Sequence, residues 1–210
     1  VDVDHANLAS AVVSRDNGDR RIYVSSVQNA VDAADEGTTV KLGEGEYDVS
    51  DKVNVDKSVT LKGVGERPVI NRTGNQWVAL KVTADDVTLE NLKLVNLDNT
   101  NANRVRGLHG NQDSEGLTIR NVVVDGVDGT VGSNEPGYGM TLLGNSTTVV
   151  DSEVKNVEGT KFAAGIRLGG DEDLEVENGT IDNVEVSEIK ETGSATDDSV
   201  GIFLASISSG

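Results

Sequence analysis

Basic residues and carboxylates recur together at one point of a repeated sequence pattern. Five short apolar segments each place one side chain where it would face outward, and polar or acidic turns follow most of them. The outward residues are Lys81, His109, Thr141, Arg167 and Phe203. The turns carry Asp85, Asp86, Asp113, Glu115, Asn145, Asp171, Glu172 and Asp173. A basic column beside a carboxylate column would form a shallow charged groove able to hold an extended polysaccharide.

Cleavage of such a polysaccharide is one chemistry that these residue types allow, because a positioned acid and base can transfer protons at the reacting bond. The candidate catalytic residues are Lys81, His109, Arg167 and Asp113, with Asp85 and Asp171 as further carboxylates. The candidate substrate-binding residues are Tyr138, in the loop 128–139, Arg167 and His109. The alternative, which we favour, is a set of solvated turns and isolated basic residues on a very acidic surface.

The acidic run from Gly169 to Glu177 is a candidate calcium site, since calcium takes six to eight oxygen ligands. Its candidate ligands are Asp171, Glu172 and Asp173, and plain solvation of these carboxylates is the competing explanation. No other cofactor is expected, and a chain without cysteine has neither thiol chemistry nor a cysteine-based metal site. The Asn-X-Ser/Thr sequences at Asn71, Asn145 and Asn178 are candidate glycosylation sites.

The charge of the chain excludes several functions. Its 36 acidic and 18 basic residues give a formal charge of −18, which repels nucleic acid and anionic membranes. Concentrated salt would screen the self-repulsion of this surface, so we expect a halophilic source, with ordinary solubility as the alternative. No apolar stretch is long enough for membrane insertion. Because the chain begins at Val1 without a leader sequence, we expect a processed or excised protein located outside the cell or at its surface.

A repeat positions these candidate residues. The stretches from Val87 to Leu97 and from Leu117 to Val127 share their apolar positions and their fifth residue, Asn. The column of fifth residues contains Gly63, Asn91, Asn121, Asp151 and Asn183, spaced by 28, 30, 30 and 32 residues. Asn and Gly tolerate the left-handed backbone of a tight bend. We therefore expect a bend at each of them, with buried Asn side chains hydrogen-bonded in a ladder between coils.

Three short strands per repeat describe one coil of a solenoid, so the sequence predicts an all-β, right-handed parallel β-helix of about five to six coils over 38–210. A capping helix is predicted over 25–37, with Ser25 or Ser26 as N-cap and Gly37 as the stop; its apolar stripe is Val27, Ala30, Val31 and Ala34. Residues 1–24 would form an arm and a hairpin around Asn17 and Gly18. All of this belongs to one domain.

The run from Ser25 to Tyr47, followed by Val53 to Gly65, resembles the entry of the pectin-lyase-like right-handed β-helix superfamily, including its archaeal and periplasmic surface repeat proteins. The resemblance covers roughly 22–206 and implies the fold. Some members that cleave acidic polysaccharides use Arg or Lys as the base together with calcium bound to Asp. Others use paired Asp residues as the acid and as the nucleophile or base. None of the local motifs of the lyase, polygalacturonase or pectin-esterase branches is intact in this chain.

The segment from Val200 to Gly210 begins a further coil and then stops, which would expose Ile202 and Leu204. Either the natural chain continues past Gly210, or a neighbouring subunit covers this coil, with the N-terminal arm as a partner for self-association. We expect an extracellular structural or adhesive β-helix, such as a subunit of a surface layer, a filament or a virion appendage. The alternatives are a polysaccharide lyase or glycoside hydrolase of the tailspike type, or a non-catalytic carbohydrate-binding module.

Overall fold

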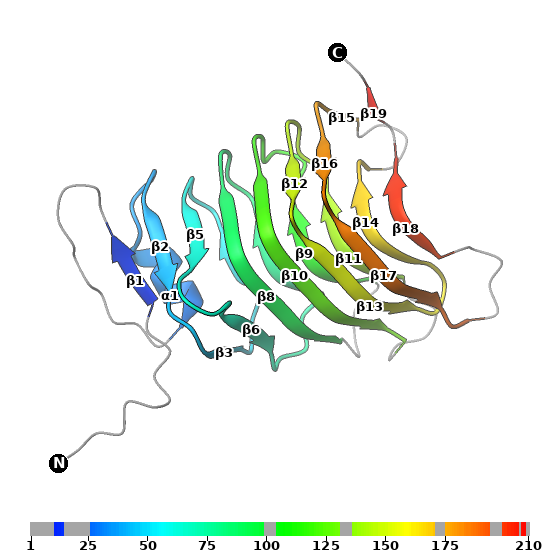
Figure 1. Ribbon diagram of the computed structural model, residues 1–210, viewed down its shortest axis with the longest axis horizontal. Coiled ribbons are helices and arrows are strands. Elements are labelled where there is room, and N and C mark those ends of the chain that lie inside the picture. The colour runs from blue at the N-terminus through cyan, green and yellow to red at the C-terminus, as the bar shows by residue number, and fades with distance from the viewer. Residues whose placement is uncertain are drawn as a thin grey trace.

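A computed structural model describes residues 26–98, 104–130, 136–170, 175–193 and 199–205, and the backbone of 11–14 and 207–208. The chain is nearly all β, and its parallel strands stack as a β-solenoid (Figure 1). One of its sheets contains six strands, and the solenoid has about four turns. This confirms the parallel β-helix that the repeat predicts. None of the described helices is long and apolar enough to cross a membrane.

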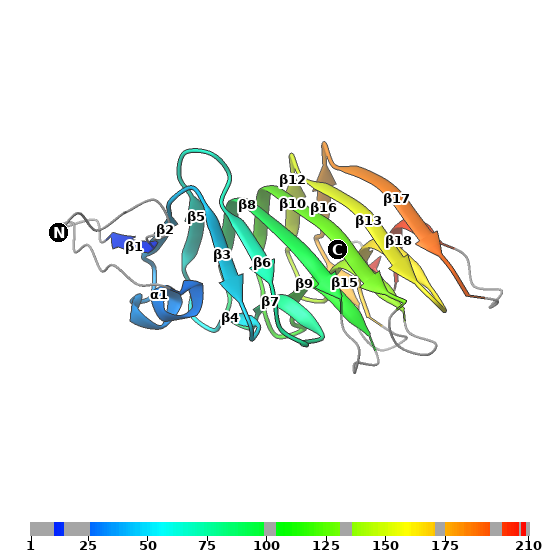
Figure 2. The same ribbon diagram turned by 90° about the horizontal axis from the view of Figure 1, so that it is seen from below.

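Two faces of the solenoid belong to one eleven-stranded sheet. The first face contains β2 (Thr39–Leu42), β5 (Thr60–Gly63), the start of β8 (Thr88–Asp98), the start of β10 (Thr118–Gly129), β12 (Thr148–Val150) and β16 (Thr180–Asp182). The second face contains β3 (Glu46–Val49), β6 (Val69–Arg72), the ends of β8 and β10, β13 (Glu153–Gly159) and β17 (Glu185–Glu191), seen side by side in Figure 2. Because β8 and β10 bend around the corner, they join the two faces.

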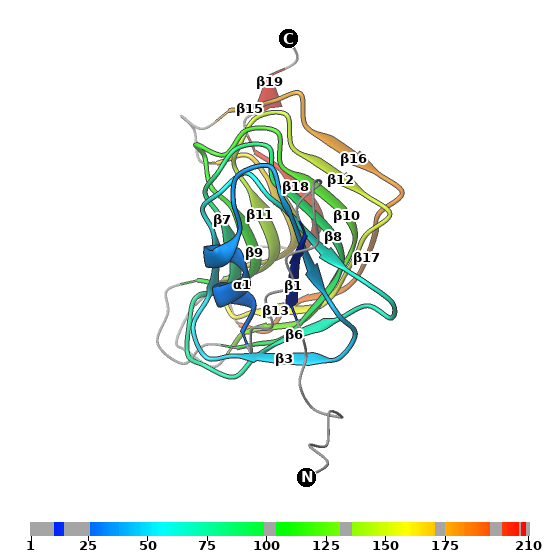
Figure 3. The same cartoon turned by 90° about the vertical axis from the view of Figure 1, so that its left-hand side faces the viewer.

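The third face is a separate sheet in which all neighbours run parallel. Its strands are β4 (Val53–Val55), β7 (Val78–Val82), β9 (Val105–Gly110), β11 (Gly137–Leu142), β14 (Ala163–Leu168) and β18 (Val200–Leu204). Figure 3 looks along the stack and shows β7, β9 and β11 across the solenoid from β8 and β10. The five segments that the sequence predicts for this face all lie in these strands.

Three further short strands complete the structure. β15 (Val176–Glu177) pairs with β19 (Ile207–Ser208), and β1 (Ala11–Ser14) pairs antiparallel with β2. The predicted hairpin turn at Asn17 and Gly18, and the arm over 1–10, lie outside the described residues. Within the described part, the partner of β1 is therefore the first strand of the solenoid.

The core is built from the apolar positions of the repeat. In β8, Leu89, Leu92, Leu94 and Leu97 are all buried. The parallel register places Leu89 between Leu61 and Ile119, so that each coil packs like side chains on like side chains. Burial of one such side chain contributes about 1.5–3 kcal/mol, which makes this layered interior the main source of stability.

The predicted Asn column marks a corner of the solenoid. Asn91, Asn121, Asp151 and Asn183 adopt left-handed backbone conformations with φ between 48° and 56°. Gly63 aligns with Asn91 but does not have a positive φ, so the prediction of a left-handed bend there is wrong. Glycine is needed at position 63 for another reason. A Cβ atom would lie 2.0 Å from the carbonyl oxygen of Asn91.

The side chains of this column form a ladder along the corner. Asn91 Nδ2 donates to the Gly63 carbonyl at 3.1 Å, and Asn121 Nδ2 donates to Asn91 Oδ1 at 3.0 Å. Arg67 donates to Asn121 Oδ1, and Asn183 Nδ2 donates to Asp151 Oδ1 at 2.6 Å. The ladder is partly or fully exposed rather than buried as predicted, because it follows the outer edge of the corner.

Two further left-handed columns escape the sequence analysis. One column lies in β8, β10, β13 and β17, where these strands turn from the second face towards the third. It contains Asn96, Gly126, Asn156 and Glu188. The corner that precedes the first face contains Asp86, Gly116, Ser146 and Asn178. Both columns have the spacing 30, 30 and 32 of the Asn column. Each of the three columns therefore turns the chain once per coil.

Replacing Asn121 by alanine is expected to lower the free energy of unfolding by about 2–3 kcal/mol, because alanine loses two side-chain hydrogen bonds and disfavours a positive φ. Asn121→Gly keeps the backbone conformation and loses only the hydrogen bonds, so its expected loss is about 1–2 kcal/mol. Denaturant unfolding of both variants measures the difference. Equal losses would contradict the conformational part of this account.

The helix closes the first end of the core. α1 (Val27–Ala33) is shorter than the predicted 25–37, because the chain is already extended at Ala34. Ser26 is the N-cap, and its side chain accepts a hydrogen bond from Asn29 N. The predicted stripe of Val27, Ala30, Val31 and Ala34 is confirmed as buried. The last carbonyls of the helix are bound by Lys57, whose Nζ donates to Asp32 O at 2.6 Å and to Ala34 O at 2.9 Å.

Candidate functional site

The predicted outward column of the third face is in register. Parallel pairing places Lys81 beside His109, His109 beside Thr141, Thr141 beside Arg167, and Arg167 beside Phe203. A single column of outward positions thus crosses five neighbouring strands. It brings the candidate residues Lys81, His109 and Arg167 onto one surface.

A second outward column runs next to it, three residues earlier in each strand. The strands bend at Gly107, Gly139 and Gly165, where a Cβ atom would lie within 2.4 Å of a core valine. This bend turns the preceding residue of each strand outward. The second column therefore contains Val78, Arg106, Tyr138, Ala164 and Val200.

Cationic and aromatic side chains alternate across the two columns. The Arg106 guanidinium carbon lies 5.1 Å from the Trp77 ring centroid and 5.7 Å from the Tyr138 ring centroid. The Arg167 guanidinium carbon lies 5.8 Å from Tyr138 and 6.0 Å from Phe203. At these distances the ring quadrupole attracts the charge. Together with Lys81, His109, Thr141 and Phe162, these residues form what we call the third-face cluster.

Ring contacts complete the cluster. The centroids of Trp77 and His109 lie 5.3 Å apart, edge to face, and Phe162 lies 5.9 Å from Tyr138 and 5.7 Å from Phe203. The chain contains one Trp, three Tyr and two Phe, and the Trp, one Tyr and both Phe belong to this cluster. Aromatic side chains are therefore concentrated on one outer face.

The cluster is also locally cationic in a chain of charge −18. Within the described part of the chain, no carboxylate forms an ion pair with Lys81, Arg106 or His109. Arg106 Nε donates to Thr141 Oγ1 at 3.2 Å, and Arg167 Nε donates to the Gly169 carbonyl at 3.2 Å. These hydrogen bonds orient the two guanidiniums on the third face.

Burial divides the cluster into two layers. His109, Tyr138, Thr141 and Arg167 are buried, whereas Trp77, Lys81, Arg106, Phe162 and Phe203 are half-buried. The groove predicted from the sequence is therefore not an open groove at His109 and Arg167. The surface that a ligand can reach is formed by the half-buried layer, which the buried layer supports from beneath.

Burial also controls protonation here. Desolvation, followed by repulsion from Arg104 and Arg167 and partly offset by Tyr138, lowers the pKa of Arg106 to about 10. Arg106 is therefore still charged near neutral pH. Desolvation, with smaller contributions from the Arg106 and Lys81 charges, lowers the pKa of His109 from 6.5 to about 3. His109 is therefore neutral, and its buried Nδ1 has no hydrogen-bond partner.

This protonation state gives little support to catalysis by His109, because a base with so low a pKa accepts a proton poorly near neutral pH. The carboxylates that the sequence predicts as an acidic column accept hydrogen bonds within the chain. Asp85 Oδ1 accepts a hydrogen bond from Glu115 N at 2.8 Å, and Asp113 Oδ2 accepts one from Asn111 Nδ2 at 3.2 Å. Asp113 and Glu115 are exposed, and both hydrogen bonds order the turns between coils.

The candidate calcium ligands Asp171, Glu172 and Asp173 lie outside the described residues. Among the residues that are described, no group of three or more His, Cys, Asp or Glu side chains could hold a metal ion.

The three candidate glycosylation sites differ in their surroundings. Asn71 Nδ2 donates to Glu46 Oε1 at 2.6 Å and to Asp48 Oδ1 at 2.8 Å, so a glycan on this nitrogen would disrupt the second face. Asn145 Oδ1 accepts from Glu177 N at 2.9 Å. Asn178 is exposed at a left-handed corner. Of the three, Asn178 is the one whose modification would disturb the stacking least.

Sequence reasoning missed Trp77, Arg106 and Phe162. Arg106 stands three residues before His109, as Tyr138 stands before Thr141, and a strict two-residue alternation places these two positions on opposite faces. The glycine between them in each strand was the available signal, because a glycine inside a strand often marks a bend.

No protein-family model matches the chain, and no curated protein is detectably similar to it.

Proposed function

We propose that the protein is a non-catalytic, adhesive β-solenoid that binds an anionic carbohydrate through the third-face cluster. The observation that carries this proposal is the concentration of aromatic rings and guanidiniums on one face of a strongly acidic chain. Aromatic rings pack against the apolar faces of sugars, and guanidiniums bind carboxylate or sulfate oxygens through paired hydrogen bonds. The half-buried Trp77 and Arg106 offer both types of contact side by side.

The stacking of the coils supports an extended ligand. Parallel strands lie about 4.8 Å apart, so residues in one column repeat along the solenoid axis at that interval. Lys81, Arg106 and the half-buried rings of Phe162 and Phe203 come from four different coils. A linear polysaccharide that lies along the axis can therefore contact several of them at once.

We further propose that the protein lies at the surface of a halophilic cell and that it belongs to the pectin-lyase-like superfamily. The charge of −18 supports the first part, because molar salt screens repulsion to within about 3 Å. The parallel solenoid with its capping helix supports the second. The low pKa of His109 favours binding over the alternative of a lyase or hydrolase.

Binding of alginate and polygalacturonate tests this proposal, with neutral dextran as the control polymer. We expect Arg106→Ala to weaken binding at least about tenfold, since a charge-assisted hydrogen bond and a stacking contact are both lost. Arg120→Ala is the matched control, because Arg120 is exposed on the first face and its removal changes the net charge equally. Isothermal titration calorimetry measures both affinities.

Two results would contradict the proposal. One is the absence of binding to either acidic polymer under conditions where the protein is folded. The other is an equal effect of Arg106→Ala and Arg120→Ala, which would show that net charge rather than the cluster governs binding. Unsaturated or reducing-end products from either polymer would instead establish the enzymatic alternative.

A further inference from the structure

The outward column of the third face continues past Lys81 to Asn54, in the first strand of that sheet. Parallel pairing of β4 with β7 places Asn54 beside Lys81. Val53 and Val55 are buried in the core, so the half-buried Asn54 side chain points outward. The strands follow one another in the order β4, β7, β9, β11, β14 and β18. A ligand that lies along the third-face cluster therefore reaches Asn54 at the β4 end of the sheet.

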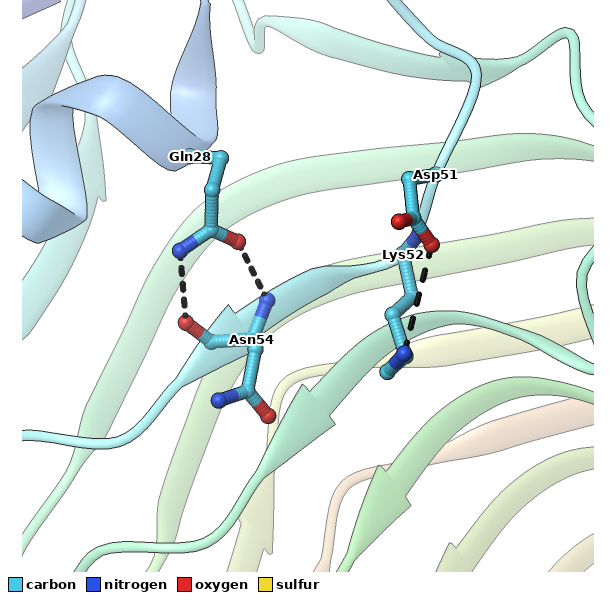
Figure 4. Close-up of polar contacts among 4 residues, drawn as sticks. All are labelled: Gln28, Asp51, Lys52 and Asn54. Atoms are coloured by element: carbon cyan, nitrogen blue, oxygen red, sulfur yellow. Dashed lines mark hydrogen bonds and ion pairs between the residues drawn. The ribbon is translucent and has the colours of Figure 1, made fainter.

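The side-chain amide of Asn54 can bind a ligand. Gln28 contacts only the backbone of this residue: Gln28 Oε1 accepts from Asn54 N at 2.7 Å, and Gln28 Nε2 donates to Asn54 O at 3.2 Å. Figure 4 shows the Asn54 side chain pointing away from Gln28. Within the described residues, no hydrogen bond holds the Asn54 amide. Its oxygen and its NH₂ group can therefore both bind sugar hydroxyls.

A polar hollow of about 370 Å³ lies next to Asn54. The charged groups on its wall are the carboxylates of Asp48 and Asp51 and the ammonium of Lys52. Asp51 Oδ1 lies 3.9 Å from Lys52 Nζ, and Figure 4 shows this ion pair beside the Gln28–Asn54 contact. Two negative charges and one positive charge repel a further carboxylate, whereas carboxylate oxygens accept hydrogen bonds from hydroxyl groups. The hollow therefore suits a neutral sugar.

The next two strands carry the accessible cations of the third-face cluster. Lys81 lies on β7 and Arg106 on β9, and both are half-buried. Among the described residues, no carboxylate forms an ion pair with either of them. The half-buried Trp77 ring lies 5.1 Å from the Arg106 guanidinium carbon. An acidic sugar fits here, because its carboxylate can pair with the cations while its ring packs on Trp77.

Beyond these cations, the accessible layer is aromatic. Phe162 directly precedes β14 and is half-buried. Its ring centroid lies 5.9 Å from that of Tyr138 and 5.7 Å from that of Phe203. A phenyl ring has no hydrogen-bond donor for a carboxylate, so that covering it with a charged group costs desolvation energy. This part of the face therefore suits a neutral sugar, whose apolar face or N-acetyl group can pack on the rings.

We propose that the ligand of the third-face cluster is an acidic heteropolysaccharide in which neutral sugars flank each acidic sugar. This inference rests on the proposed function, because it names the class of anionic carbohydrate that the same site binds. The hollow, the cations and the rings follow one another along the sheet in the order neutral, acidic, neutral. A homopolymer of uronic acids would place one carboxylate against Asp48 and Asp51 and another against Phe162. Such mismatches suppress the binding of a wrong partner.

Isothermal titration calorimetry with hyaluronan and with polygalacturonate tests this inference. Hyaluronan alternates glucuronate with N-acetylglucosamine, whereas every sugar of polygalacturonate is acidic. We expect hyaluronan to bind at least about tenfold more tightly, although it carries fewer charges per unit length. Polygalacturonate should still bind measurably, because Lys81 and Arg106 can pair with any uronate.

Two outcomes of this titration separate the inference from the proposed function. Equal affinities, or tighter binding of polygalacturonate, would show that charge density governs binding. That result would overturn the inference and leave the proposed function standing. No binding of either polymer would contradict the proposed function itself, and the inference with it.

Asp51→Lys tests the contribution of the hollow, because it makes the net charge of the lining positive. The ratio of the hyaluronan affinity to the polygalacturonate affinity should fall by about threefold. Glu66→Lys is the matched control, because Glu66 is exposed between β5 and β6 and its replacement changes the net charge equally. Equal changes of the ratio in both variants would overturn the inference.

Phe162→Ala tests the aromatic end of the site. It should weaken hyaluronan binding about tenfold, as truncation of a central contact does, and leave polygalacturonate binding nearly unchanged. Circular dichroism checks that the variant is folded. If it is not, Asn54→Ala takes its place, because the hydrogen bonds of Gln28 to the Asn54 backbone do not need that side chain. Equal weakening of both polymers by the folded variant would overturn the inference.

Discussion

Gly144→Ala is expected to destabilise the protein by about 3 kcal/mol or more, the range of severe overpacking in a core. A Cβ atom at Gly144 would lie 1.6 Å from the carbonyl oxygen of Ser114 and 2.7 Å from its carbonyl carbon. These are backbone atoms of the preceding coil, so they cannot move aside as a flexible side chain can. The carbonyl of Gly144 also accepts a hydrogen bond from Thr147 Oγ1 at 2.8 Å, which a displaced turn would lose.

Gly126→Asn is the matched control for this prediction. Gly126 has a φ of 85° and stands in the column that contains Asn96 and Asn156. The nearest atom to a Cβ there is Asn96 N at 3.9 Å, so the site has room for a side chain. Because Asn tolerates a left-handed backbone, we expect a change within about 1 kcal/mol. Thermal and denaturant unfolding measure both variants. A loss at Gly144 no larger than that at Gly126 would show that the coils can move apart at little cost.

Acidification from about pH 7 to about pH 4 is expected to destabilise the folded chain by about 3 kcal/mol through His109 alone. In the unfolded chain this residue takes up a proton below pH 6.5, whereas in the folded chain its pKa is lowered to about 3. The unfolded state therefore binds more protons in this interval. The contribution of His109 to the free energy of unfolding is fully present above pH 6.5 and is lost progressively as the pH falls towards 3.

His109→Phe isolates this contribution, because phenylalanine keeps a ring next to Trp77 and has no proton to gain. Near neutral pH the variant should be about as stable as the native chain, since the Nδ1 atom that it removes has no hydrogen-bond partner. Between pH 6.5 and 4, its free energy of unfolding should fall by about 3 kcal/mol less than that of the native chain. His5→Gln is the control for the other histidine. Identical pH profiles for His109→Phe and the native chain would contradict the lowered pKa of His109.

The fold was predictable because its strongest signals are local and repeated. Leu89 and Ile119 alternate with outward residues in each copy, and stacking of identical units leaves few alternatives for the register. The Asn column was recognised because Asn has a specific conformational role at a bend. Its two companion columns were missed because they mix residue types, as in Asn96, Gly126 and Glu188. The residues of each column share a backbone conformation but no common residue type.

The candidate site was predictable only in part. The register of Lys81, His109 and Arg167 follows from the repeat and is confirmed. Their burial is not a local property, since it depends on how neighbouring side chains such as Trp77 and Phe162 cover them. The bend at Gly107, which brings Arg106 to the same side as His109, also depends on close approach of the Val124 side chain. Neither effect can be derived from alternation within one strand.

The three left-handed columns also bear on how the length of the molecule is set. Since each corner and each close glycine contact joins equivalent positions one coil apart, the 30 residues from Val87 to Gly116 contain a full set of the contacts that one coil makes with the next. A tandem duplication of that segment would lengthen the solenoid by about 4.8 Å without requiring a new type of contact. The length of the solenoid therefore depends on the number of copies of this coil. Longer solenoids can be built by repeating it, without new types of contact.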